Sequence, residues 1–309
     1  MSNTITAAII QAEPVYYDLA RTMEKAVSLI HETVSKGANL ITFGETWFPG
    51  YPVWLDICSD MGLWDYAPTK EVWAQLYKNS PTADGAEMHE MANLAKQLGI
   101  VLILPINERV ENKAGHGTLY NSILTMDATG EIVNHHRKLV PTHTERIVWG
   151  AGDGAGLQAV DTAVGRVGGL VCWEHWMPLA RQTMHESAEQ IHIAAWPTVK
   201  DMLQIASRHY AHEGRSFVLA AGSILRASQI PKQLTISEGI KPDDFVLRGG
   251  SAIIAPDGSY LVEPVYNEEA ILTAELDLDM IIRESMALDV TGHYSRPDVF
   301  DLSVNRKRK

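Results

Sequence analysis

A cysteine placed where a strand turns into a helix is the first residue of this sequence that could do chemistry. Residues 168–178 predict a buried strand, a bend and a helix, with Cys172 at the bend. A nucleophile at such a junction is held on rigid backbone and stays accessible, as catalysis requires. Most buried cysteines are inert. A reactive thiol therefore needs a base, a cation and a pocket from elsewhere in the chain.

Glu45 is the candidate base because it follows the apolar strand predicted over 39–43. A carboxylate there is costly to bury without partners, so an exposed loop acid is an equally good interpretation of Glu45 alone. The aromatic residues Trp47, Phe48 and Tyr51 follow closely and favour a site shielded from water. Shielding raises the pKa of a carboxyl group and suits proton transfer near neutral pH.

Lys138 follows a predicted hairpin strand and could stabilise negative charge that develops when a thiolate adds to a multiple bond. Most lysines, however, lie at the surface. Glu145 could orient Lys138 or Glu45, although pairing with the adjacent Arg146 is the better interpretation of this residue on its own. The residues alone thus suggest a thiol site but do not decide which charged residues belong to it.

The histidines offer little support for a metal site. His135, His136 and His143 are close in sequence, but they fit neither the H-E-x-x-H nor the C-x-x-C arrangement. Neighbouring residues on a strand point to opposite faces, so His135 and His136 do not easily share one ion. The sequence also lacks a Walker loop, a Gly-x-Ser-x-Gly elbow and a convincing dinucleotide fingerprint. We predict no metal and no cofactor, with a zinc hydrolase using Cys172 as a remote alternative.

Composition limits the possible partners. The chain has 309 residues, 46% apolar content and a net charge of −12, which argues against nucleic acid as a partner. No apolar run approaches the roughly 20 residues that span a bilayer, and no signal peptide is visible. The two cysteines, Cys58 and Cys172, fit a reducing cytoplasm. We expect a cytoplasmic protein without a membrane partner, whose basic run at 306–309 is a solvated tail.

The elements needed to position these residues form two similar halves. Helical periodicity predicts helices from Asp18 to about Gly37 and over 69–77, 86–98, 177–187 and 200–215. Apolar runs predict strands over 4–12, 39–43, 100–107, 168–172, 191–195, 217–221 and 270–278, with hairpins at 120–136 and 251–264. A short helix near Arg283 precedes an irregular tail from about residue 286. We predict a single α/β domain over 1–309, with two mixed sheets packed face to face and helices outside.

Three segments of the sequence resemble a known family. Residues 44–52 (GETWFPGYP), 136–146 (HRKLVPTHTER) and 172–179 (CWEHWMPL) closely resemble the signature segments of nitrilases, in the carbon–nitrogen hydrolase superfamily. The resemblance extends as far as residues 292–297. It implies an α-β-β-α sandwich and a hydrolase with Cys172 as nucleophile, Glu45 as general base, Lys138 as cation and Glu145 as a supporting acid.

The resemblance also implies a reaction and its partners. A small-molecule nitrile would consume two waters and give a carboxylic acid and ammonia, through a thioimidate and a thioester on Cys172, without a cofactor. Self-association to a dimer or larger is implied as well. Candidate substrate-binding residues are Trp173, His175, Trp196, Tyr51 and Trp54, although core packing explains most of the tryptophans equally well. The alternatives are an amidase of the same superfamily and a catalytically silent binding or scaffold relative.

Overall fold

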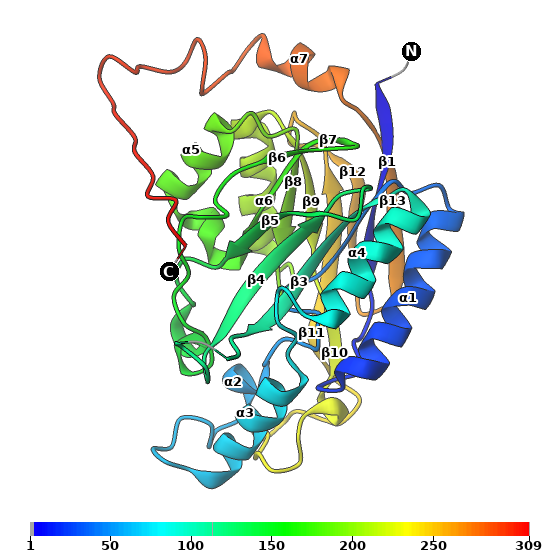
Figure 1. Ribbon diagram of the computed structural model, residues 1–309, viewed down its shortest axis with the longest axis vertical. Helices are drawn as coiled ribbons and strands as arrows, with labels where there is room; N and C mark the ends of the chain where they lie inside the picture. Colours follow the sequence, from blue (N-terminus) through cyan, green and yellow to red (C-terminus); the bar gives the residue numbers. More distant parts are fainter. Residues whose placement is uncertain (1–2, 113, 309) are drawn as a thin grey trace.

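Two β-sheets face each other at the centre of the molecule, with helices on both outer faces (Figure 1). The computed structural model describes residues 3–112 and 114–308. The first sheet has the order β13–β1–β2–β3–β4–β5, and its strands are β1 (Thr4–Gln11), β2 (Leu40–Phe43), β3 (Val101–Arg109), β4 (Leu119–Met126), β5 (Ile132–Arg137) and β13 (Ala270–Asp277). The second has the order β10–β11–β9–β8–β7–β6 with β12 beside β11, and its strands are β6 (Val160–Thr162), β7 (Gly165–Val171), β8 (Ile191–Ala195), β9 (Phe217–Ala221), β10 (Ile224–Arg226), β11 (Phe245–Ile254) and β12 (Tyr260–Tyr266).

The helices complete an α-β-β-α sandwich, which confirms the predicted fold class. Helices α1 (Leu19–Ser35) and α4 (Ala86–Leu98) pack on the first sheet, and α5 (Pro178–Glu186) and α6 (Asp201–Gly214) pack on the second. Helices α2 (Trp54–Ile57), α3 (Ala67–Asn79) and α7 (Asp279–Ser285) lie at the ends of the sandwich (Figure 1). The 3-10 turns are η1 (His143–Ile147), η2 (Cys172–Trp176) and η3 (Ala227–Gln229).

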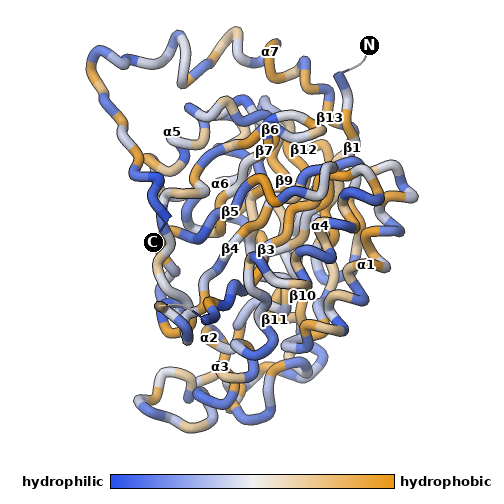
Figure 2. The backbone as a smooth tube through the Cα atoms, viewed as in Figure 1, coloured by the Kyte–Doolittle hydropathy of each residue, from blue (hydrophilic) through white to orange (hydrophobic). Residues whose placement is uncertain are grey.

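Burial on both faces explains why the central strands are continuous apolar runs. On β1, Ala7 and Ile9 pack between the sheets, whereas Ala8 and Ile10 pack against α1 and α4. Alternate side chains of a strand point to opposite faces, so a strand covered on both sides needs apolar residues at every position. Figure 2 shows hydrophobic residues gathered along these strands and a mixture of both kinds along α1.

Local signals fix several element boundaries. The Asp18 carboxylate accepts a hydrogen bond from the Arg21 N–H at 3.1 Å, so it caps α1. Helix α4 ends at Leu98, and Gly99 follows with φ 65°, a left-handed conformation that suits glycine. The β4–β5 hairpin turns at Gly130, which has φ 83°. The predicted helix start at Asp18, the helix end at residue 98 and the hairpin at 120–136 are therefore confirmed.

The structure departs from the sequence prediction in short segments. Strands β6 and β10 were not predicted, because three residues are too few to show alternation. The strand predicted over 168–172 is β7, which begins earlier and ends at Val171. Cys172 therefore opens the turn η2, and the following helix begins only at Pro178.

Residues 306–308 of the basic run are exposed to solvent, as predicted, but two of their side chains also contact the body of the protein. Arg306 donates to the Leu157 carbonyl, and Arg308 forms an ion pair with Asp153 at 3.1 Å. The extended segment after α7 runs back past α5 to reach this position (Figure 1). Lys309 lies outside the described residues. Within residues 3–112 and 114–308, no helix has the length and apolar character needed to cross a bilayer.

Candidate active site

The structure brings Cys172, Glu45, Lys138 and Glu145, hereafter the tetrad, into one buried cluster. Cys172 follows β7, Glu45 follows β2, Lys138 follows β5, and Glu145 lies in η1. The Cys172 sulfur and one carboxylate oxygen from each glutamate lie within 4.8 Å of one another. Every member of the tetrad is at most 4% exposed. Strand ends from both sheets therefore meet at a single site.

A close approach between the two sheets places Glu45. The Glu45 N–H donates to the Trp196 carbonyl at 3.0 Å, which joins the end of β2 to the end of β8. A Cβ at Gly44 would lie 2.3 Å from Ser223 Oγ, so only glycine allows this approach. The candidate base is thus held by backbone on a rigid strand end.

Glu174 holds the turn that carries Cys172. Cys172 has φ 53°, a strained left-handed conformation for a residue with a side chain. The Glu174 carboxylate accepts the Val171 N–H at 2.7 Å and the Leu139 N–H at 2.8 Å. His136 Nε2 lies 2.9 Å from the same carboxylate. One buried carboxylate therefore ties the cysteine turn to the loop that carries Lys138, a role that the sequence did not reveal.

Lys138 bridges the two acids of the tetrad. Its Nζ lies 3.1 Å from Glu45 Oε1 and 2.5 Å from Glu145 Oε2. The Glu145 carboxylate also accepts the Thr142 N–H at 2.7 Å and the Tyr51 hydroxyl at 3.0 Å. Glu145 thus fixes the lysine, and it does not form the pair with Arg146 that the residues alone favoured.

Burial sets the ionisation of the tetrad. Burial raises the pKa of Glu45 to about 7. The positive charge of Lys138 acts to lower this pKa, and the negative charge of Glu145 acts to raise it. Burial, joined by the charge of Glu45, also raises the pKa of the Cys172 thiol well above its ordinary value. For Lys138, burial acts to lower the pKa, but the neighbouring acids outweigh it and keep the pKa above its ordinary value. The resting site is a neutral thiol beside a permanent cation and a carboxyl group poised to exchange a proton near pH 7.

The acids and the thiol have atoms close enough to ligate one metal ion, but the position between the two carboxylates holds the Lys138 ammonium.

The candidate metal-binding histidines do not come together. His136 Nε2 pairs with Glu174 at 2.9 Å, whereas His135 Nε2 pairs with Glu108 at 2.8 Å on the opposite face of the first sheet. The expectation that adjacent histidines point apart is confirmed.

The predicted substrate-binding residues lie in different places. Tyr51 contacts the tetrad through its hydrogen bond to Glu145. Trp173 is 55% exposed on the outer surface, although it directly follows Cys172 in the chain. Trp54 is buried, with its indole N–H 2.6 Å from the Tyr17 hydroxyl. Among the residues that the structure describes, Tyr51 is thus the one of these three whose side chain forms a hydrogen bond with the tetrad.

His175 and Trp196 lie behind the cysteine turn. Their rings stack with centroids 4.6 Å apart, and the Trp196 indole N–H donates to Ser207 Oγ at 3.1 Å. His175 Nδ1 lies 2.7 Å from the Cys172 carbonyl oxygen. These contacts support the turn.

Trp47 and Phe48, which were expected to shield the site, are fully buried against Phe43 in the core beneath α1 and α4.

Asn121 is a site residue that the sequence analysis missed. Its Nδ2 donates to Glu45 Oε1 at 2.6 Å, and its carbonyl accepts the Lys138 N–H at 2.8 Å. The available signal was a buried amide in the apolar strand 120–126. The second carboxylate oxygen, Glu45 Oε2, has no hydrogen-bond partner within the part of the chain that the structure describes. That oxygen is available to accept the thiol proton.

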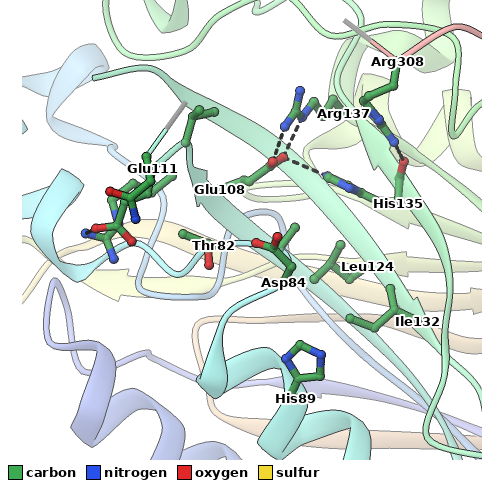
Figure 3. A pocket seen from close by; sticks show the side chains of 14 residues that line it. Thr82, Asp84, His89, Glu108, Glu111, Leu124, Ile132, His135, Arg137 and Arg308 are labelled. Carbon is green, nitrogen blue, oxygen red and sulfur yellow. Dashed lines mark hydrogen bonds and ion pairs between the residues drawn. The ribbon is translucent and has the colours of Figure 1, made fainter. Parts of the chain in front are cut away.

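A separate hollow lies on the outer face of the first sheet, where α4 leaves it uncovered (Figure 3). At its centre the Glu108 carboxylate accepts hydrogen bonds from Arg137 and His135 (Figure 3) and from Ser122. Members of the tetrad do not line this hollow. Its central charges neutralise one another, so the chemistry belongs to the site between the sheets.

Comparison with known proteins agrees with this geometry. A family model described as carbon-nitrogen hydrolase matches residues 6–283. An arylacetonitrilase of Aspergillus niger is 39% identical, and the match covers 100% of this chain and 91% of that protein. An aliphatic nitrilase of Sinorhizobium fredii is 37% identical, covering 98% of this chain and 96% of the relative. The fold is similar to that of Saccharomyces cerevisiae Nit3, a member of branch 10 of the nitrilase superfamily, with TM-score 0.70, 19% identity and coverage of 94% and 96%. The chain therefore belongs to the carbon–nitrogen hydrolase family and is an enzyme of the nitrilase type.

Proposed function

We propose that this enzyme converts a small organic nitrile and two waters to a carboxylic acid and ammonia through a covalent bond to Cys172. The observation that supports it is the meeting of a thiol, two carboxylates and an ammonium group within one buried cluster. Each group has a physical reason to be there. The thiol needs a base, the base needs a raised pKa, and the charge that develops on the substrate needs a cation.

In the first half of the reaction, the sulfur adds to the nitrile carbon. Glu45 Oε2 takes the thiol proton as the Sγ–C bond forms. Negative charge develops on the nitrile nitrogen, and the Lys138 ammonium and the backbone N–H of Trp173 stabilise it. Protonation of that nitrogen gives a thioimidate, with Glu45 supplying the proton it had taken.

In the second half, two waters release the products. Glu45 removes a proton from the first water as its oxygen adds to the thioimidate carbon. Glu45 passes this proton to the nitrogen, and the hydroxyl proton of the tetrahedral adduct follows by the same route. The C–N bond breaks as the C=O bond forms, the nitrogen leaves as ammonia, and a thioester remains on Cys172. A second water, activated in the same way, cleaves the C–S bond. The carboxylic acid departs, and the thiol regains its proton.

A nitrile panel matched with the corresponding amides tests this function. We expect ammonia release from nitriles with the carboxylic acid as the main product, and little release from the amides. Aryl-containing and aliphatic nitriles both belong in the panel, since relatives named for each class are similar to this chain. Cleavage of amides without cleavage of nitriles would instead support the amidase alternative.

The pH dependence of kcat/KM is expected to report Glu45. The base must be ionised, so activity falls as pH falls through about 7. The Asn121 hydrogen bond lowers the pKa of Glu45, so Asn121→Leu should move this fall to higher pH. At pH 6 the variant should lose roughly threefold to tenfold more activity than the parent. Asn93→Leu, at an exposed position of α4, is the control and should leave the profile unchanged. A variant profile that overlays the parent would exclude this role for Asn121.

We propose that two copies of the chain associate through the outer face of the second sheet's helices. Exposed apolar side chains gather on η2, α5 and α6, which contact one another, namely Trp173, Trp176, Leu179, Met202 and Ile205. A patch of this kind favours a protein partner. Light scattering should give at least a dimer, which Ile205→Glu weakens and Leu261→Glu, on β12, does not. A parent protein that is monomeric at micromolar concentration would contradict the proposal.

The proposed compartment is the reducing cytoplasm. Both cysteines are free and buried. A nucleophilic thiol that must stay reduced is compatible with that environment.

A further inference from the structure

A chain of buried polar side chains leads from the back of the second sheet to the backbone of Cys172. Glu189 Oε1 lies 2.8 Å from His192 Nδ1, and His192 Nε2 lies 2.9 Å from His175 Nε2. His175 Nδ1 lies 2.7 Å from the Cys172 carbonyl oxygen. The other oxygen of Glu189 accepts the Tyr210 hydroxyl at 2.6 Å. Each of these four side chains is at most 5% exposed, and the mechanism above assigns them no role.

Donor and acceptor counting fixes the protons in this chain. A carbonyl oxygen only accepts, so His175 Nδ1 must carry a hydrogen toward Cys172. In a neutral imidazole the other nitrogen then accepts, so His192 Nε2 must donate to His175 Nε2. The lone pair of His192 Nδ1 therefore faces Glu189 Oε1. Two acceptors at 2.8 Å repel each other unless a proton lies between them. These side chains together thus hold one more proton than two neutral histidines and an ionised Glu189 carboxylate would.

Burial places that proton on Glu189. It raises the pKa of Glu189 to about 8, although the Tyr210 hydrogen bond and His185 act to lower it. Burial also lowers the pKa of His192 well below its ordinary value and that of His175 to about 3. The titratable and charged groups around these side chains come from α5, α6, β5 and η2, namely His185, Arg181, Glu213, His136 and Glu174. The neutral acid with two neutral histidines is therefore the form present at pH 7.

The peptide bond between Cys172 and Trp173 connects this chain to the nucleophile. The Trp173 N–H acts to lower the pKa of the Cys172 thiol, while the carbonyl of the same peptide accepts His175 Nδ1–H. In a trans peptide the C=O and N–H point in opposite directions, so holding one end orients the other. That N–H also serves as a donor to the developing charge in the proposed mechanism.

We propose that Glu189, as a protonated acid, sets the tautomers of His192 and His175 and thereby positions the Cys172–Trp173 peptide for catalysis. This inference rests on the proposed nitrile hydrolysis at Cys172. Loss of the Glu189 proton leaves two acceptors facing each other. The histidines can relieve this by exchanging tautomers, but His175 Nδ1 then presents a lone pair to the Cys172 carbonyl. Activity should therefore fall as pH rises through about 8, opposite to the acid-side fall set by Glu45.

Glu189→Gln tests the proton directly, because a glutamine amide has the same shape as the neutral acid. Its NH2 group donates to His192 Nδ1 and its oxygen accepts the Tyr210 hydroxyl. We expect kcat at pH 7 within about threefold of the parent and loss of the alkaline fall. Glu189→Leu removes the donor and should lower kcat by about 100-fold, similar to removing one oxyanion donor, with KM nearly unchanged. Tyr210→Phe keeps the ring but removes a bond that lowers the pKa of Glu189, so the alkaline fall should move to higher pH.

The outcomes that would overturn the proposal are distinct from failure of the proposed function. A parent profile without an alkaline fall, a Glu189→Gln profile that keeps it, or a loss in Glu189→Gln as large as in Glu189→Leu would each do so. A further measurement is independent of activity. The infrared spectrum of the parent near pH 6 should show a buried carboxylic-acid carbonyl band that Glu189→Gln lacks, and absence of that difference overturns the proposal. Nitrile hydrolysis by the parent enzyme separately tests the function on which the inference rests.

Discussion

Replacing Cys172 with alanine is expected to lower nitrile hydrolysis by about 10⁴-fold or more, because no other group can form the covalent intermediate. The loss should appear in kcat, since the tetrad acids and Lys138 remain to enclose the substrate. The fold should persist, as the change removes one sulfur atom from a turn held by Glu174. Steady-state ammonia release and circular dichroism of the same preparation measure both effects.

Cys58→Ala is the matched control. Cys58 is also free and buried, but it packs in the cluster around Trp54 and Leu76 rather than in the tetrad. Its activity should stay within a few-fold of the parent. Substantial turnover by Cys172→Ala, or equal losses in the two variants, would contradict the role of Cys172 as nucleophile.

Replacing Lys138 with methionine is expected to damage activity and stability together. The ammonium group bonds to Glu45 and Glu145, and its side chain is fully buried. Its removal leaves two buried carboxyl groups without their counter-ion, which raises the pKa of Glu45 further and removes the base at neutral pH. Loss of base and cation together should lower kcat/KM by about 10³-fold or more. Breaking a buried pair should cost about 3–5 kcal/mol of unfolding free energy.

The stability loss in Lys138→Met should depend on pH in a defined direction. Carboxyl groups whose pKa is raised on folding stabilise the folded protein below their unfolded pKa and lose that contribution as pH rises through the folded pKa. The folded pKa of Glu45 is already about 7 in the parent. Urea denaturation should therefore show a larger deficit at pH 8 than at pH 5. Lys36→Met, which breaks the exposed pair with Glu32, should cost at most about 1 kcal/mol at either pH. An equal deficit for Lys138→Met at both pH values would argue against unpaired buried acids.

Long periodic segments of the fold were predictable because local signals and tertiary packing agree. The strand over 191–195 and the helix over 86–98 have the predicted bounds, since an apolar run covered on both faces and a glycine stop leave little ambiguity. The segments that were missed or shifted, β6, β10 and η2, are held by neighbouring chain rather than by their own pattern. The Leu139 N–H, for example, ties η2 to the loop after β5 through the Glu174 carboxylate.

The site was only partly accessible from the sequence. The motif resemblance named the tetrad, but the spacing along the chain could not show that strand ends from two sheets converge. Asn121 was missed because one amide in an apolar strand gives no recognisable pattern. Trp47 and Phe48 were placed at the site for their proximity to Glu45, yet the chain after β2 turns both side chains into the core against Phe43. The Glu189–His192–His175 chain depends on α6 and β8 packing together, which no local signal encodes.

Peptide mass spectrometry of enzyme quenched in acid during turnover of a nitrile tests the central claim most directly. Acid stops hydrolysis of the thioester and preserves the bond between substrate and enzyme. The account predicts that the peptide containing Cys172 carries the added mass of the thioimidate or the acyl group, and that the Cys58 peptide does not. Turnover accompanied by the substrate's mass on a residue other than Cys172 would contradict it.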